Sequence, residues 1–134
     1  MAIAVCYDLE FPEWMRTLAL AGADVLAAPV NWPLFPRPEG ERPLEIVRAQ
    51  ANASVNHIFV AACDRAGVER GQEWLGGSVI IDPDGFPLTT ITLGRPHIAL
   101  ARIDVTTARD KAIGPRNDVF GDRRPALYRA VVGE

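Results

Sequence analysis

The residue of this sequence best placed for covalent chemistry is Cys6, which closes an apolar run over residues 1–6. Such a run is typical of a buried strand, and Pro12 followed by Glu13 is typical of the first turn of a helix. A cysteine between a strand and a helix lies where backbone N–H groups and the helix dipole favour the nucleophilic thiolate. The backbone N–H of Tyr7 would then face a developing oxyanion. By placement alone, however, Cys6 also fits a strand cysteine that only fills the core.

A cysteine nucleophile needs a base, and the chain offers few acids near Cys6. Glu10 and Glu13 are the nearest glutamates. Glu13 falls in the first turn of the expected helix, where a carboxylate complements the helix dipole, and we favour a structural role for both residues over a direct role as base. Lys111, the only lysine, lies far along the chain and is expected to be a solvated helix residue.

Asn31 and Trp32 follow a second apolar stretch, residues 24–29. They are expected at the edge of a parallel sheet where ligands bind. On the residues alone, an Asn that makes a turn and a Trp that covers the core are equally good interpretations. Cys63 lies inside another apolar run and is expected to be a small core residue. The charged stretch over residues 65–73 is interpreted as a solvated loop, with a pocket rim as the alternative.

The elements that must position these residues begin with a βαβαβ pattern. Helical spacing of apolar residues predicts helices over residues 12–21 and 42–56, and the buried strands are expected at 1–6, 24–29 and 58–63. Proline-rich residues 30–40 must form a loop. Short helical crossovers between successive strands make the sheet parallel, so the fold class is α/β.

The pattern changes in the second part of the chain. Residues 77–82, 86–93 and 97–105 are expected to be antiparallel strands, with a turn at residues 82–85. Thr106 and Thr107 can cap a short helix that runs to Lys111. Residues 114–134 are interpreted as a tail that docks on another surface, with a loose, solvated terminus as the alternative.

Composition excludes several classes of function. The chain has 134 residues, a length that fits one domain, with 49% hydrophobic residues, 23% charged residues and a net charge of -3. No basic stripe is present for nucleic acid, and no apolar run approaches the length of a membrane span. No signal-type leader is visible, so a cytoplasmic location is expected for the chain as written.

The metal-binding residue types are too dispersed to predict a metal site. The two cysteines, Cys6 and Cys63, do not form a Cys-x-x-Cys pair and have no histidine at metal spacing. His57 and His97 stand alone and are expected to be structural or solvent-facing. We expect free thiols in a reducing compartment and no metal ion.

The segment around Cys6 resembles the nucleophile segment of the nitrilase superfamily of carbon-nitrogen hydrolases. It reads Cys6-Tyr7-Asp8-Leu9-Glu10-Phe11-Pro12-Glu13, and further family landmarks follow in order: Gly22-Ala23-Asp24-Val25, Pro29-Val30-Asn31-Trp32, Arg48-Ala49, Asn56, Gly76-Gly77-Ser78, Asp82-Pro83-Asp84-Gly85 and Asp122-Arg123-Arg124-Pro125. Together they extend over nearly the whole chain. The resemblance identifies Cys6 as the nucleophile and favours Tyr7, Asn31 and Trp32 as substrate-binding residues.

In that family a glutamate base, an oxyanion-stabilising lysine and a cysteine nucleophile act together. Only Cys6 matches one of them in this chain, since the family's glutamate and lysine lie upstream of the cysteine segment. The resemblance implies the carboxy-terminal half of a four-layer αββα sandwich, a partial domain over residues 1–134 with 114–134 as a docking tail. An isolated half should leave apolar sheet faces uncovered.

The implied reaction is hydrolysis of a small amide or carbamoyl compound through a cysteine thioester, without metal or organic cofactor. Cys6-Tyr7-Asp8 departs from the Cys-Trp-Glu form associated with nitrilases, which favours an amidase. Val55 stands where many relatives carry a glutamate, which weakens the transfer of a narrow substrate class. The family's tails often pack against a second subunit, so a homo-oligomer is expected.

Two other classes of function remain open on the sequence. The chain alone is expected to be inactive, and it could be a non-catalytic binding or oligomerisation module derived from this fold. A flavodoxin-like βαβ ligand binder is a weaker alternative, because it predicts no reactive thiol and does not explain the antiparallel pattern after Gly76.

Overall fold

The computed structural model describes residues 1–131 and contains a four-stranded sheet in the order β1-β2-β3-β6. The strands are β1 (Ala2–Ile3), β2 (Val25–Val30), β3 (Phe59–Asp64) and β6 (Val79–Ile81). β1, β2 and β3 run parallel, and β6 is antiparallel to β3. The predicted βαβαβ unit is therefore confirmed, although β1 is shorter than expected.

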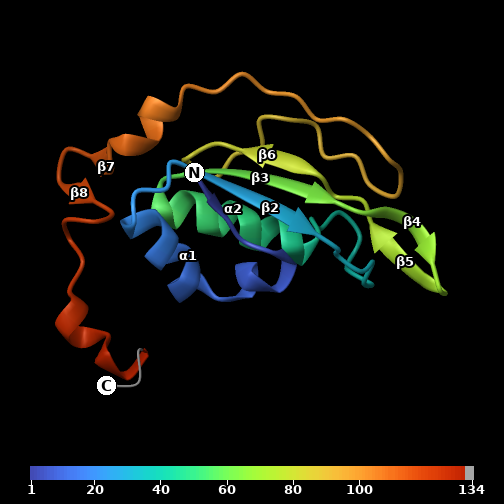
Figure 1. Cartoon of the computed structure of the whole chain (residues 1–134), viewed down its shortest axis with the longest axis horizontal. Helices are drawn as coiled ribbons and strands as arrows, with labels where there is room; N and C mark the ends of the chain where they lie inside the picture. Colours follow the sequence, from blue (N-terminus) through green and yellow to red (C-terminus); the bar gives the residue numbers. More distant parts are fainter. Residues whose placement is uncertain (132–134) are drawn as a thin grey trace.

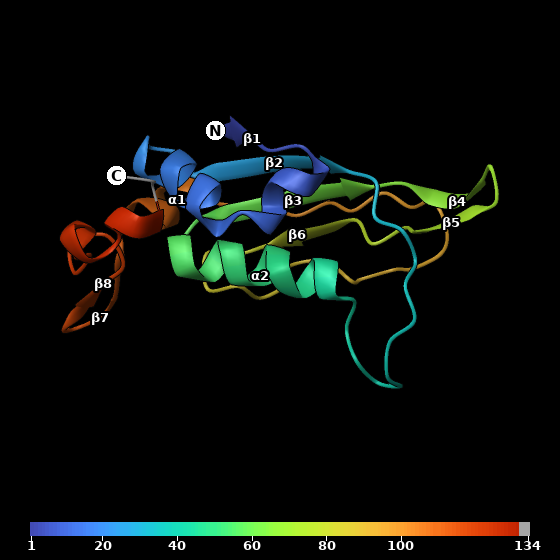
Figure 2. The same cartoon turned by 90° about the horizontal axis from the view of Figure 1, so that it is seen from below.

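Both α-helices lie against one face of this sheet (Figures 1 and 2). α1 (Pro12–Leu20) starts with proline in its first turn, and α2 (Leu44–Asn56) is followed by its C-cap His57, whose φ is 47°. Met15 of α1 and Ile46 of α2 are fully buried against the strands. Burial of a side chain of this size contributes about 1.5–3 kcal/mol. The covered face is the hydrophobic core of the chain.

The opposite face of the sheet is largely open. Ile3 is 62% exposed and Val5 is 57% exposed, although both follow the apolar pattern of a strand buried on both sides. Cys63 is also exposed, so its prediction as a core residue is wrong. The reason is that successive strand residues point to opposite faces and the helices cover only one. The prediction of uncovered apolar sheet surface is confirmed.

The charged stretch after β3 is a hairpin, where the sequence was interpreted as a loop. β4 (Ala66–Glu69) pairs antiparallel with β5 (Gln72–Leu75). Arg70 and Gly71 form its two-residue turn with φ values of 50° and 81°. Positive φ at both turn residues matches the twist of a tight hairpin, and the glycine was the signal in the sequence.

Two of the predicted antiparallel strands are absent from the described chain. Residues 82–85 form the expected turn, closed by a 3.0 Å bond from the Gly85 N–H to the Asp82 carbonyl. Beyond it, only an isolated bridge joins Pro87 to Ile81, and the rest of 86–93 and 97–103 has no strand structure. Pro87 and Pro96 have no N–H to donate, which disfavours continuous pairing here. In Figures 1 and 2 the orange segment crosses the side of the sheet away from the helices.

The last described part of the chain contacts both the end of α2 and α1. It consists of short elements: the 3₁₀ helices η2 (Val105–Arg109), η3 (Pro125–Leu127) and η4 (Arg129–Val131), with the hairpin strands β7 (Ala112–Gly114) and β8 (Asn117–Asp118) before η3. The cap of η2 is Asp104, whose carboxylate accepts the Thr106 N–H, and not a threonine. Residues 132–134 of the expected tail lie outside the described residues.

Lys111 anchors this segment and is not the solvated helix residue that was expected. Its Nζ donates to the carbonyls of Asn56 (3.2 Å) and His57 (2.7 Å), which end α2, and lies 4.8 Å from the centroid of the Phe120 ring. A cation stabilises the free carbonyls at a helix carboxyl terminus. Burial lowers the pKa of Lys111 from its ordinary value.

Within residues 1–131 no helix is long and apolar enough to cross a membrane.

Candidate active site

Cys6 lies at a sharp turn between β1 and a short 3₁₀ helix, η1 (Cys6–Glu10). Its φ of 46° is in the left-handed region, which costs a non-glycine residue about 1–2 kcal/mol. Asp8 closes the turn: its carboxylate accepts the Val5 N–H at 2.7 Å, and its own N–H donates to the Val5 carbonyl at 3.0 Å. The predicted strand-to-helix turn at the cysteine is thus confirmed. The contribution of Asp8 was not foreseen.

Three neighbouring parallel strands bring their carboxyl ends together at this turn. Cys6 follows β1, Asn31 follows β2, and Asp64 ends β3 opposite Val30 in the register of the sheet. The backbone N–H of Asn31 donates to Cys6 Sγ at 3.4 Å. Ligand sites in parallel sheets form at this edge. Asn31 was predicted to border the site, and the structure brings it into contact with the cysteine.

Asp64 was not identified from the sequence, yet it organises this edge. Its Oδ1 accepts the N–H groups of Trp32 (2.9 Å) and Arg65 (2.8 Å), and its Oδ2 accepts the N–H of Gly77 (2.8 Å). The Asp64 N–H donates to the Ser78 hydroxyl at 2.8 Å. Burial raises the pKa of the Asp64 carboxyl above its usual range, although the backbone donors oppose that shift. The only sequence signal was an acidic residue at the end of an apolar run.

Tyr7 and Trp32 point into different environments. The Trp32 side chain is 5% exposed and belongs to the hydrophobic core, whereas Tyr7 is 71% exposed. The Tyr7 ring packs edge-on against Phe11, with centroids 5.3 Å apart. The core-covering interpretation of Trp32 agrees with this placement. Substrate binding by either residue stays a prediction.

The two glutamates near Cys6 have structural surroundings. Glu10 forms a 3.0 Å ion pair with Arg48 of α2, and Glu13 is exposed in the first turn of α1. Asn52, one turn further along α2 than Arg48, donates to the Leu9 carbonyl at 2.9 Å. Contacts from α2 therefore hold η1 and the nucleophile turn in place. The geometry agrees with the structural roles favoured for Glu10 and Glu13.

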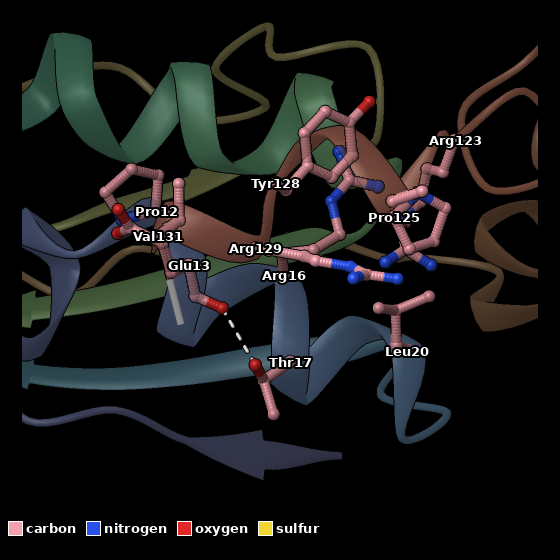
Figure 3. Close-up of a pocket in the computed structure, with 11 residues that line it drawn as sticks. Pro12, Glu13, Arg16, Thr17, Leu20, Arg123, Pro125, Tyr128, Arg129 and Val131 are labelled. Atoms are coloured by element: carbon pink, nitrogen blue, oxygen red, sulfur yellow. Dashed lines mark hydrogen bonds between the residues drawn. The ribbon is translucent and has the colours of Figure 1, made fainter. Parts of the chain in front are cut away.

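A cavity of about 660 Å³ lies away from these residues, between α1 and the carboxyl-terminal segment (Figure 3). Arg16, Arg123 and Arg129 line it together with other polar and apolar side chains, and Cys6 and Asn31 do not. Burial and the nearby charge of Arg123 lower the pKa of Arg16. No cysteine lines this cavity, whereas Cys6 lies where the parallel strands end, so we assign the candidate site to the strand ends. Among residues 1–131, no three His, Cys, Asp or Glu side chains are grouped to hold a metal ion.

Comparison with known proteins places residues 1–112 within the family model described as carbon-nitrogen hydrolase. A nitrilase of Pyrococcus abyssi is 37% identical over 130 residues, which are 96% of this chain and 46% of the relative. A 2-oxoglutaramate amidase of Bacillus subtilis is 36% identical over 124 residues, 92% of this chain and 45% of the relative. The chain therefore spans about half the length of the curated relatives it matches.

The fold agrees with a solved amidase structure. A variant of the amidase from Nesterenkonia sp. AN1 superposes with a TM-score of 0.75 at 29% identity, covering 96% of this chain and 42% of that one. That structure shows covalent addition of the acetamide moiety of fluoroacetamide at the active-site cysteine of the amidase. The mixed α/β architecture is the nitrilase-type fold predicted from the sequence.

Proposed function

Because this chain belongs to the carbon-nitrogen hydrolase family, we propose that it carries the nucleophile of an enzyme that hydrolyses a small amide or carbamoyl compound. The observation that carries the proposal is the position of Cys6, in a left-handed turn at the carboxyl edge of the parallel strands, with the Asn31 N–H on its sulfur. The amidases among the relatives support an amide as the substrate class, and Cys6-Tyr7-Asp8 favours an amidase over a nitrilase.

The proposed reaction proceeds through a thioester. The Cys6 thiol gives its proton to a base, and the thiolate attacks the carbonyl carbon. The C–N bond breaks, and ammonia or an amine leaves after it takes up that proton. Water then attacks the thioester carbon, the C–S bond breaks, and a carboxylic acid and the thiol are released. Backbone N–H donors at the turn, that of Tyr7 included, are suited to stabilise the oxyanion. This route uses no metal or organic cofactor.

We further propose that the chain corresponds to the carboxy-terminal half of the αββα domain. The open, apolar face of the sheet supports this assignment, because a four-layer sandwich packs a second sheet on that face. The family's glutamate and lysine would then come from polypeptide outside this sequence. We expect the 134-residue chain alone to show no measurable amidase activity, since removing members of a cooperating catalytic set leaves little chemistry. The same open face favours the alternative, a non-catalytic binding or oligomerisation module.

The role of Cys6 is tested with Cys6→Ala in the whole protein, by which we mean this chain together with the polypeptide proposed to supply the glutamate and the lysine. We expect kcat for a small amide to fall at least about a thousandfold, because the thioester cannot form. Cys63→Ala is the matched control and should leave kcat unchanged, since it removes the other thiol of the chain and leaves the turn at Cys6 intact. Turnover that survives in Cys6→Ala would refute the nucleophile assignment. A whole protein that is folded but inactive on amides would favour the non-catalytic module.

We also propose that the protein is a homo-oligomer that uses its carboxyl-terminal segment as a docking tail. Leu127 in η3 is 72% exposed, beside the cavity that α1 forms with this segment. Leu127→Glu should shift sedimentation velocity of the whole protein toward the monomer, because a charge would be buried in the contact. Val68→Glu, at a residue 71% exposed in the β4–β5 hairpin, is the control and should not. Unchanged sedimentation of Leu127→Glu would argue against this docking role.

A further inference from the structure

We propose that Asp64 is a positioning residue for the nucleophile. Its carboxylate fixes residues 31–32 so that the Asn31 N–H stays on Cys6 Sγ. This inference rests on the proposed role of Cys6 and assigns a function to an acid whose carboxylate binds backbone N–H groups. Asp64 acts through the Trp32 N–H, which it accepts at 2.9 Å, next to the peptide group that reaches Cys6.

The segment that Asp64 holds is fixed on several sides. The Trp32 ring is buried in the core, the Trp32 N–H points to Asp64, and the Trp32 carbonyl accepts the Leu75 N–H at 2.8 Å. Asn31 precedes Trp32 directly, and its own side chain is exposed. The direction of the Asn31 N–H therefore depends on how Trp32 is anchored, and Asp64 is the only side chain that binds the Trp32 backbone among residues 1–131.

The site requires a carboxylate because all the groups that face it are donors. The N–H groups of Trp32, Arg65 and Gly77 share its two oxygens. An ionised carboxylate accepts at both oxygens, whereas an asparagine amide would place an NH₂ against one of these N–H groups. Hydrogen bonds to an ionised acceptor are about twice as strong as neutral ones. The Asp64→Asn variant thus keeps the shape of the side chain and weakens its hydrogen bonds to these backbone N–H groups.

No cation pairs with Asp64 in the described part of the chain. The Arg65 guanidinium pairs instead with Glu69 and lies over the Trp74 ring, 5.4 Å from its centroid. Backbone N–H groups lower the pKa of Asp64, but burial outweighs them and raises it. A negative charge acting only through space would disfavour the Cys6 thiolate. Positioning and through-space charge therefore predict opposite effects of Asp64→Asn.

The test measures alkylation of Cys6 by iodoacetamide in the 134-residue chain, followed by peptide mass spectrometry, with the exposed Cys63 as an internal reference. In Asp64→Asn we expect the Cys6 rate to fall about tenfold and the Trp32 amide to exchange hydrogen faster, because the anchor is weakened. Asp82→Asn is the matched control. Asp82 also accepts two backbone N–H groups, those of Asp84 and Phe86, in a distant turn, and its variant should keep the Cys6 rate.

An unchanged or faster Cys6 rate in folded Asp64→Asn would overturn the proposal, the faster rate indicating a through-space charge. If Asp64→Asn does not fold, the wild-type chain decides. Acidification protonates the Asp64 carboxylate, so it should lower both the ratio of Cys6 to Cys63 alkylation and the protection of the Trp32 amide from hydrogen exchange. If both quantities stay constant, the inference is overturned. No turnover is measured, so failure here is distinct from failure of Cys6→Ala to abolish amide hydrolysis.

Discussion

The two faces of the sheet have similar residues and opposite surroundings. Toward the helices, Leu26 of β2 and Ile81 of β6 are fully buried. On the other face, Ile3 is mostly exposed and Ile80, next to Ile81, is only partly covered. Both faces are apolar, which is the pattern of strands that are covered on both sides. The difference shows that the apolar composition of a strand indicates on which faces a sheet can be covered. Among the described residues, only the helices form such a covering layer, and they cover one face.

The strongest test of this difference uses the adjacent isoleucines of β6. Ile81→Ala should lower the free energy of unfolding by about 2–5 kcal/mol, because it leaves a cavity in the core. Ile80→Ala should cost about 1 kcal/mol or less, since its side chain loses few contacts. Urea unfolding of the 134-residue chain compares the two. Equal losses would mean that the open face is as well packed as the covered one.

A smaller effect is expected at Asp64, where β3 ends at the border between the two faces. Burial raises its folded-state pKa, so between about pH 4 and that higher value the folded chain binds more of this proton than the unfolded chain. The contribution of Asp64 to the free energy of unfolding therefore falls as pH rises through this window. Asp64→Asn removes that contribution.

The measurement is the difference in unfolding free energy between the wild-type chain and Asp64→Asn, followed from about pH 4 to about pH 7. The unfolding free energy of the wild type, relative to that of Asp64→Asn, should be larger near the acidic end of this pH range than near its neutral end. Asp104 and Asp118 contribute the opposite slope, because hydrogen bonds lower their pKa values, but both proteins contain them and the term cancels. A difference that is flat with pH would show that Asp64 is as solvated as an unfolded aspartate.

The sequence predicted local features better than long-range ones. The turn at Cys6, the parallel unit and the helices follow from apolar periodicity and the proline in the first turn of α1, which act over neighbouring residues. Asp64 and Lys111 could not be placed in this way. Their partners, the Trp32 N–H and the Asn56 and His57 carbonyls, are distant in sequence and carry no side-chain signal.

The expected strands at residues 86–93 and 97–105 failed for a related reason. Their alternating pattern is real, but a strand also needs a neighbour with free hydrogen-bonding groups, and periodicity does not report one. In the structure Ile98 remains 87% exposed, although its position fits the pattern. The hairpin after β3 was not predicted, because its many charged residues are typical of a solvated loop. The turn formed by Arg70 and Gly71 was therefore not recognised.

At Cys6 the left-handed backbone makes the residue that is best for stability different from the residue that is needed for chemistry. Glycine adopts a φ of 46° without the steric cost that a side chain incurs, so replacing the cysteine would gain roughly 1 kcal/mol of stability and remove the sulfur. Selection for a thermostable fold and selection for a thiol would favour different residues there. A sulfur-bearing residue retained in this conformation is a trade-off in which the fold gives up some robustness for chemistry.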